Sequence, residues 1–233
     1  MKFKAVIFDL FGTLVDDFVS SAGPVHMDMA DALEVSYDQF TPLWNQTLEM
    51  RIVGAFGTVE ANVEYVCNAM NRRPSAEQIK KAVEIRMSSI KLALQPKPDA
   101  VATLAQIKTA GYKTGLVSNA SIEIPMLWQE TAFADLIDTP IFSSRAHLRK
   151  PDSRIYHLAC ERLAVRSEFC LYVGDGEDHE LAGAAKIGLH PVLIRNSSRQ
   201  RGSRVHQETK DWQGPSIADL TEVLDILNRK NRE

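Results

Sequence analysis

A carboxylate directly after a short apolar run is the first side chain in this sequence that could carry chemistry. Asp9 follows the apolar residues 5–8 and opens the segment DLFGTL at residues 9–14. Ligands of an open parallel sheet bind at the carboxyl ends of its strands, and a carboxylate there can act as a nucleophile. Gly12 permits a tight turn that would bring backbone N–H groups toward an anion. The segment therefore predicts a nucleophile beside an anion site.

Three further polar segments contain residue types that suit a phosphate and a cation. Ser118 and Asn119 follow a second apolar run and offer a hydroxyl and an amide that can donate to phosphate oxygens. Lys150 precedes a predicted helix and could neutralise a carboxylate and a phosphate together. Asp175 and Glu180 follow another apolar run, and carboxylates at a strand end suit a hard cation such as Mg²⁺. Each segment alone is a modest signal.

Five short apolar runs are predicted to be the strands that position these segments. Continuous apolar runs are typical of a parallel sheet that is covered on both faces. Helical patterns alternate with the runs after residue 95, opening near residue 98, at residue 153 and at residue 181. This alternation predicts a Rossmann-like, doubly wound α/β sheet. The predicted strands are Ala5–Phe8, Thr114–Val117, Pro140–Phe142, Phe169–Val173 and Pro191–Ile194.

About 80 residues after the first motif contain no convincing strand and are predicted to form an all-helical insert. Ser75 and Gln78 suit a capping box at the start of its last helix. The prolines of residues 95–98 would break that helix and form a hinge. We therefore predict an α/β core of residues 1–15 and 95–233 and a helical domain of residues 16–94. The predicted helices are Met27–Leu33, Asp38–Val53, Val59–Met70 and Ala76–Leu94.

Length and composition are those of an ordinary globular protein. The chain has 233 residues, 45% of them apolar, and its 27 basic and 30 acidic side chains leave a net charge of −3. The balance argues against a protein that coats nucleic acid. No stretch approaches the roughly 18 apolar residues of a membrane span. We expect a soluble, cytoplasmic monomer or homodimer without nucleic-acid or membrane partners, whose three cysteines are idle thiols.

The order and spacing of the four polar segments resemble the haloacid dehalogenase superfamily over nearly the whole chain. The resemblance implies that Asp9 becomes an aspartyl-phosphate, that Lys150 steadies it, and that the helical insert is a cap. It implies phosphate binding by Gly12, Ser118, Asn119 and Lys150. It also implies a Mg²⁺ site made by Asp9, the backbone carbonyl of Phe11, Asp175 and, in a direct or supporting role, Glu180.

Phe11 departs from the pattern of the phosphatases in this family, which usually have a second aspartate at this position. That aspartate protonates the leaving group, and general acid catalysis is typically worth about 10²–10⁴-fold. A phenyl side chain cannot supply the proton. Substrates with good leaving groups would then suffer least, unless a residue near the cap supplies it. Asp16, Asp17 and His26 are the candidates, although a surface histidine is the simpler interpretation of the last.

The sequence leaves three alternatives to a phosphatase. The 2-haloacid dehalogenases of the family also have an aromatic residue at this position, but they need no metal, and the intact Asp175 favours a metal-dependent enzyme. Phosphonoacetaldehyde hydrolase needs a cap lysine, and there is no lysine between Lys4 and Lys80. A degenerate binding module would have lost site residues that are all present here. A Mg²⁺-dependent phosphohydrolase acting on a small phosphorylated metabolite is therefore the leading hypothesis.

Arginines in two regions could bind an anionic substrate, but both have ordinary interpretations. Arg51 and Arg86 in the insert could contact a carboxylate or phosphate, although arginines on helix surfaces usually do not. Trp44 and Phe56 in the insert are interpreted as packing residues. A basic cluster after the last predicted strand is interpreted as a solvated loop. Its residues are Arg195, Arg199, Arg201 and Arg204.

Overall fold

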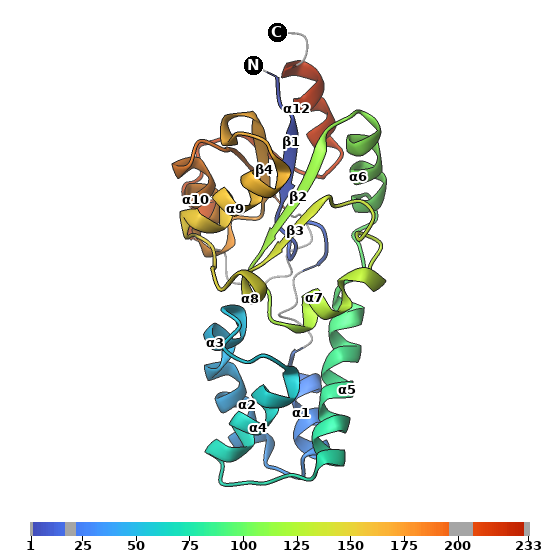
Figure 1. The fold of residues 1–233 in the computed structure, drawn as a ribbon, viewed down its shortest axis with the longest axis vertical. Coiled ribbons are helices and arrows are strands. Elements are labelled where there is room, and N and C mark those ends of the chain that lie inside the picture. Colours follow the sequence, from blue (N-terminus) through green and yellow to red (C-terminus); the bar gives the residue numbers. More distant parts are fainter. Residues whose placement is uncertain (1, 17–21, 196–206, 231–233) are drawn as a thin grey trace.

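The computed structural model describes residues 2–16, 22–195 and 207–230. It is an elongated molecule with a parallel sheet at one end and a group of helices at the other (Figure 1). The two ends are joined by the segments on either side of the helical insert. This arrangement fits the predicted α/β core with an inserted all-helical part, while the boundaries at residues 15/16 and 94/95 stay a prediction.

The sheet has six parallel strands in the order β3-β2-β1-β4-β5-β6. The central strand β1 pairs with β2 on one side and β4 on the other, so the carboxyl ends of these three strands lie side by side. All five predicted strands are confirmed. The sixth, β6, has two residues and was not predicted. The strands are β1 (Ala5–Phe8), β2 (Lys113–Ser118), β3 (Thr139–Phe142), β4 (Cys170–Gly174), β5 (His190–Ile194) and β6 (Ser216–Ile217).

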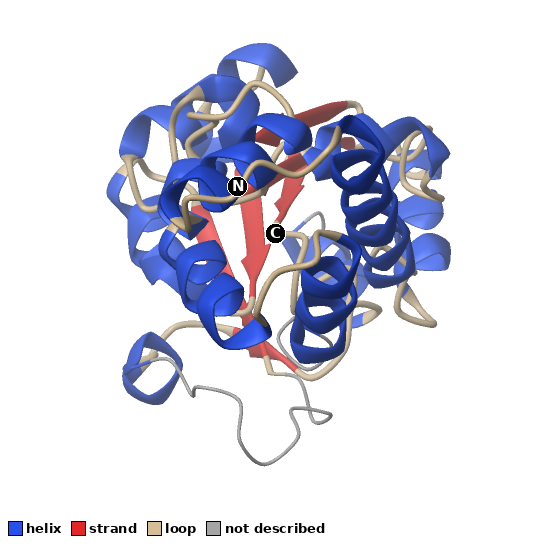
Figure 2. Ribbon diagram, turned by 90° about the horizontal axis from the view of Figure 1, so that it is seen from below, coloured by secondary structure: helices blue, strands red, loops and turns tan. Residues whose placement is uncertain are grey.

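Helices cover both faces of the sheet, which is why the strands are continuously apolar (Figure 2). Val6 and Phe8 of β1 face the layer that contains α6 (Ala100–Thr109) and α12 (Glu222–Lys230). Ala5 and Ile7 face α9 (Ser153–Leu163) and α10 (Glu180–Lys186) on the other side. The predicted doubly wound architecture is confirmed. Shorter helices are α7 (Glu123–Leu127), α8 (Ser143–Ala146) and α11 (Gln207–Asp211), with 3-10 turns at Trp128–Glu130, Ser167–Phe169 and Glu177–His179.

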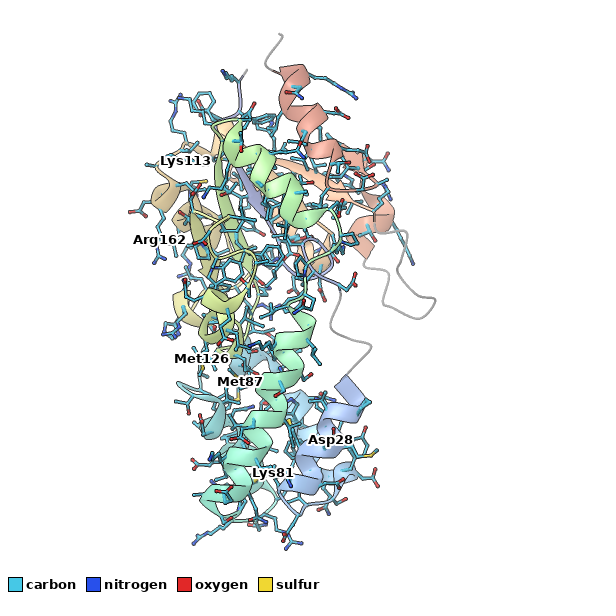
Figure 3. The ribbon with its side chains drawn as sticks, turned by 90° about the vertical axis from the view of Figure 1, so that its right-hand side faces the viewer. Asp28, Lys81, Met87, Lys113, Met126 and Arg162 are labelled. Atoms are coloured by element: carbon cyan, nitrogen blue, oxygen red, sulfur yellow. The ribbon has the colours of Figure 1, made fainter. Side chains whose placement is uncertain are left out.

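The helical insert has its own hydrophobic core. Met29, Phe40, Trp44, Val63 and Val66 are fully buried in it, so the prediction that Trp44 is a packing residue is confirmed. The predicted capping box is also present at the start of the last helix. The helices are α1 (Ala22–Ala32), α2 (Tyr37–Gln46), α3 (Leu48–Ile52), α4 (Val59–Ala69) and α5 (Ala76–Ala93). Met87 of α5 and Met126 of α7 mark the junction between the insert and the sheet end (Figure 3).

The prediction of one helix over Asp38–Val53 is wrong, because the chain breaks into α2 and α3 at Thr47. The carbonyl of Trp44 accepts from the backbone N–H and hydroxyl of Thr47 and from Nη1 of Arg51, at 2.6 Å. A carbonyl occupied by these donors turns away from regular i→i+4 pairing. The buried guanidinium therefore stabilises the break between the two helices.

The two linkers to the insert run side by side. Val15 forms an antiparallel bridge with Pro96, and the backbone N–H of Lys97 donates to the carbonyl of Leu14 at 3.0 Å. The three cysteines are buried free thiols, as predicted. In the described part of the chain, no helix is both long and apolar enough to cross a membrane. Arg195 is exposed at the end of β5, and the rest of the basic cluster, Arg199, Arg201 and Arg204, lies outside the described residues.

Candidate active site

The turn after β1 holds Asp9 at the centre of the sheet edge. The backbone N–H of Asp9 donates to the carbonyl of Val173 in the neighbouring strand at 2.9 Å. Gly12 has a φ of +73°, a left-handed conformation that favours glycine. A β-carbon at this position would overlap the carboxylate of Asp175. The glycine therefore lets the turn after β1 lie directly against the segment that follows β4.

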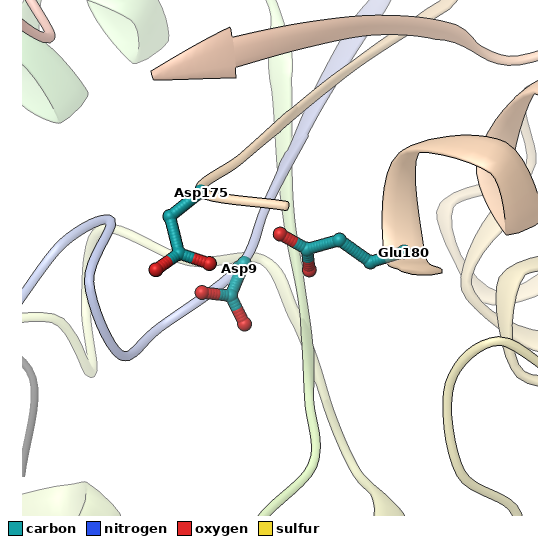
Figure 4. A group of neighbouring side chains, drawn as sticks. All are labelled: Asp9, Asp175 and Glu180. Carbon is teal, nitrogen blue, oxygen red and sulfur yellow. The ribbon is translucent and has the colours of Figure 1, made fainter. Parts of the chain in front are cut away.

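Three buried carboxylates meet at this edge. The side chains of Asp9, Asp175 and Glu180 point toward one another (Figure 4), and one oxygen of each lies within 4.8 Å of the others. Their exposed fractions are 5%, 2% and 0%. Like charges at this separation repel strongly in a buried site, so the cluster needs cations to hold its negative charge. The three acids therefore lie together at one edge of the sheet, as the sequence predicts.

Lys150 supplies one of those cations. Its Nζ donates to Oδ1 of Asp9 at 2.5 Å and to Oε2 of Glu180 at 2.6 Å. Burial lowers the pKa of this ammonium, but the two carboxylates more than offset burial and raise the pKa well above its usual value. Lys150 is therefore fixed in its charged form between the two acids.

Glu180 is fully occupied as an acceptor. Its Oε2 accepts from Lys150 and from the Tyr172 hydroxyl at 2.7 Å, and its Oε1 accepts from the backbone N–H of Gly176 at 3.0 Å. Burial, opposed by Lys150 and helped by the neighbouring acids, raises the pKa of Glu180 to about 8. Glu180 is fully buried and orients Lys150 through the hydrogen bond that it accepts from the lysine.

Ser118 and Asn119 are both at the end of β2, but their side chains are used differently. The Ser118 hydroxyl oxygen is buried and has no hydrogen-bond partner within the described ranges, so it can form a hydrogen bond with a bound ligand. Asn119 instead fastens the Lys150 loop: its Oδ1 accepts from the Lys150 N–H at 2.8 Å, and its Nδ2 donates to Asp178 at 2.5 Å. Its side chain therefore positions the lysine.

Phe11 is partly buried and packs against the hydrophobic core of the sheet. Asp16, one candidate proton donor, is exposed on the first linker, and Asp17 lies outside the described residues. His26 is buried, with only 5% of its surface exposed, so its interpretation as a surface residue is wrong. Burial and the nearby Arg86 and Arg51 lower the pKa of His26 to about 4. It is neutral near pH 7 and therefore lacks the imidazolium proton that a general acid would donate.

Lys97 was missed as a site residue by the sequence analysis. Its Nζ donates to the carbonyl of Gly12 at 2.6 Å, across 85 residues of sequence. Burial lowers the pKa of Lys97 below its usual value, although the charges of four nearby acids oppose this shift. The acids are Asp16, Asp175, Asp99 and Asp9. The available signal in the sequence was the position of this lysine between two prolines in the second linker. Lys97 brings a second cation to the turn after β1.

Glu123 was also missed, and it pairs with one of the arginines that had no assigned role. Arg86 Nε donates to Oε1 of Glu123 at 2.8 Å, and the two side chains are only 6% and 1% exposed. Arg51 is buried as well, with its guanidinium 4.5 Å from the centre of the Trp44 ring. Both arginines are therefore buried, so the expectation that they lie on helix surfaces is wrong. A charged residue in the apolar segment 122–128 was the available signal for Glu123.

Substitution of Gly12 by alanine is expected to lower kcat/KM at least about 100-fold in any reaction that uses the carboxylates of Asp9 and Asp175 together. The new methyl group would push Asp175 out of the cluster, and the left-handed backbone would add about 1–2 kcal/mol of strain. Steady-state kinetics and thermal melting measure the two effects. Gly111→Ala is the control, because Gly111 has a φ of +85° but open space around it. Equal activity losses in both variants would contradict the proposed clash.

Comparison with known proteins agrees with this geometry. A family model described as a haloacid dehalogenase-like hydrolase matches residues 3–188. The chain belongs to this family and is a hydrolase. It is 26% identical over 231 residues to glyceraldehyde 3-phosphate phosphatase of Methanothermobacter thermautotrophicus, which covers 96% of this chain and 99% of the relative. It is 29% identical over 202 residues to (S)-2-haloacid dehalogenase 4A of Burkholderia cepacia, covering 82% of each chain.

Solved structures show the same fold. The 2-haloacid dehalogenase from Pseudomonas syringae pv. Tomato DC3000 superimposes with a TM-score of 0.69 at 19% identity, covering 98% of this chain and 99% of that one. A HAD phosphatase from Thermococcus onnurineus superimposes with a TM-score of 0.65 at 21% identity, covering 97% and 98%. Both kinds of hydrolase therefore occur among the similar proteins.

Proposed function

We propose that the protein is a Mg²⁺-dependent phosphatase that hydrolyses a small phosphorylated metabolite through an aspartyl-phosphate on Asp9. The observation that carries the proposal is the buried carboxylate of Asp175 next to Asp9. A third acid in this position adds repulsion to a cluster that already holds two carboxylates. A bound divalent cation would offset that repulsion and would explain why Asp175 is placed here.

The residues present suit magnesium. Asp9 and Asp175 offer carboxylate oxygens from two neighbouring strand ends, and the backbone carbonyl of Phe11 would complete the protein ligands. Glu180 has both oxygens occupied by hydrogen bonds and would support the site without binding the ion directly. When bound, Mg²⁺ would withdraw charge from the phosphoryl oxygens.

In the proposed reaction a free carboxylate oxygen of Asp9 attacks phosphorus in line with the departing oxygen. The bond from phosphorus to the leaving group breaks, and the phosphoryl group stays on Asp9 until water releases it. Lys150 orients Asp9 through its hydrogen bond and neutralises the transferred group, while the Ser118 hydroxyl donates to that group. Because Phe11 offers no proton, the leaving oxygen departs as an anion. We therefore propose that acyl and aryl phosphates react faster than alkyl phosphates.

A 2-haloacid dehalogenase is the second candidate, and Phe11 is the residue that favours it. Asp9 would then attack the carbon that carries the halogen, halide would leave without needing a proton, and the reaction would need no metal. A binding module without activity is a weaker candidate, since Asp9, Lys150 and Asp175 retain a tightly ordered geometry.

Product release from a substrate panel tests these functions. The panel contains acetyl phosphate, p-nitrophenyl phosphate, sugar phosphates, nucleotides and 2-chloropropionate, each with Mg²⁺ and with EDTA. We expect phosphate release that requires Mg²⁺ and is fastest with acetyl and p-nitrophenyl phosphate. Chloride release that persists in EDTA would instead identify a dehalogenase and leave Asp175 without its proposed role.

A further inference from the structure

A small cavity lies between the helical insert and the sheet end. It measures about 10 Å³, enough for one water-sized group. Most of its wall is apolar, but three of its lining residues, Arg51, Asn62 and Glu123, are polar and more than nine-tenths buried. The other lining residues are Phe56, Thr58, Val59 and Ile122.

Four polar atoms of these lining residues have no hydrogen-bond partner among the residues that the structure describes. They are Nε of Arg51, Nδ2 and Oδ1 of Asn62, and Oε2 of Glu123. Other atoms of the same side chains do have partners: Nη1 of Arg51 donates to the Trp44 carbonyl, and Oε1 of Glu123 accepts from Arg86. Buried polar groups are rarely left unpaired, because each costs about 1–3 kcal/mol when it loses water without gaining a partner. The cavity is therefore built to receive a polar group.

The four atoms define the chemistry of that group. The guanidinium and the amide nitrogen can only donate, whereas the amide oxygen and the ionised carboxylate can only accept. Among the functional groups of a small ligand, a hydroxyl fills one water-sized space and both accepts and donates hydrogen bonds, as a water molecule does. A carboxylate would meet two acceptors, and an ammonium would meet two donors.

The position of the cavity connects it to the reaction. Glu123 is the first residue of α7 and follows Ser118 at the end of β2 by five residues, so it belongs to the edge of the sheet that carries the site. Arg51 and Asn62 approach from α3 and α4 of the insert, which also docks on the sheet end through Ser143, whose hydroxyl donates to the Ile52 carbonyl at 2.7 Å. The part of a substrate beyond its phosphoryl group would extend toward the insert.

We propose that this cavity is a specificity subsite that binds a hydroxyl group of the substrate, which makes the natural substrate a hydroxylated phosphate ester. The inference rests on the phosphatase function proposed above. Arg51 and Asn62 would donate to the hydroxyl oxygen, and its proton would go to Asn62 or Glu123. An alkyl phosphate of the same length would leave these buried groups without a substrate partner.

Binding of matched ligands tests the subsite without requiring turnover. Calorimetry in the Asp9→Asn background would compare glycerol 1-phosphate with propyl phosphate, and ribitol 5-phosphate with pentyl phosphate. For at least one pair we expect the hydroxylated ligand to bind about 10–100-fold more tightly. Asn62→Leu removes both amide atoms at similar volume and should bring that ratio below about threefold. The control Asn68→Leu, at an exposed position of the same helix, should preserve it.

The possible results separate the subsite from the overall function. Equal affinity within every pair, no binding of any ligand, or a ratio that survives Asn62→Leu would overturn the subsite and leave the cavity as a place for a structural water only. Discrimination by binding in a protein whose wild type releases no phosphate from any ester would support the subsite and contradict the phosphatase. Phosphate release without discrimination would do the reverse.

Discussion

Replacing Asp9 by asparagine is expected to lower the rate of phosphate release by at least about 10⁴-fold. The amide has nearly the shape of the carboxylate, but it is a poor nucleophile and cannot form the acyl phosphate. Its carbonyl oxygen can still accept from Lys150, which lies 2.5 Å from the present carboxylate. The fold should therefore persist while the reaction stops. Initial rates at saturating substrate measure the loss, and thermal melting verifies the fold.

The control for this variant is Asp135→Asn, which removes an exposed carboxylate elsewhere in the α/β part. Its rate should stay within about twofold of the wild type. Peptide mapping after acid quenching should find a phosphoryl group on the Asp9 peptide of the wild type alone. An Asp9→Asn protein that keeps more than a tenth of the activity would refute both the nucleophile and the covalent intermediate.

The strands were predictable because their physical signal is local. Each buried strand must be apolar on both faces, so β1 is visible as an uninterrupted apolar run ended by a carboxylate. β6 could not be found in this way, because two residues carry no periodicity. The break in the helix at Thr47 depends on Arg51 reaching the Trp44 carbonyl, and helical periodicity does not register such a bond.

Part of the site was predictable for a topological reason. The carboxyl ends of adjacent parallel strands share one edge, so residues after β1, β2 and β4 had to come together. Two other contacts follow no such rule. Arg86 meets Glu123 across 37 residues, and Lys97 reaches Gly12 across 85. Neither pair has a spacing that marks it: the docking of the insert creates the first pair, and the two linkers that run side by side create the second.

Replacing Lys150 by methionine is expected to lower kcat by about 10³-fold and to destabilise the protein. Methionine keeps the length of the side chain but leaves Asp9 and Glu180 as buried carboxylates without their shared cation. Breaking a buried ion pair by removing one partner typically costs about 3–5 kcal/mol. Urea unfolding and steady-state kinetics measure the two losses. Lys186→Met, at an exposed position of α10, should change neither.

The pH dependence of unfolding separates the structural role of Lys150 from its catalytic role. The pKa of Glu180 is already raised from 4.5 to about 8, so the folded state binds more protons than the unfolded state between these values. The contribution of Glu180 to the free energy of unfolding is complete below pH 4.5 and is lost as the pH rises toward 8. Without Lys150 the pKa of Glu180 should rise further. The free energy of unfolding of Lys150→Met should therefore keep falling above pH 8, where the decline that Glu180 causes in the wild type levels off.

Adding Glu180→Gln to Lys150→Met should recover much of the lost stability near pH 8, because a neutral amide can stay buried without a cation. The pH dependence should flatten, since the titrating group is gone. Activity should stay near the level of Lys150→Met, because neither change restores a positive charge beside Asp9 and the transferred phosphoryl group. If the double variant instead regained activity along with stability, Lys150 would act only by holding the fold, and its proposed role in the reaction would be wrong.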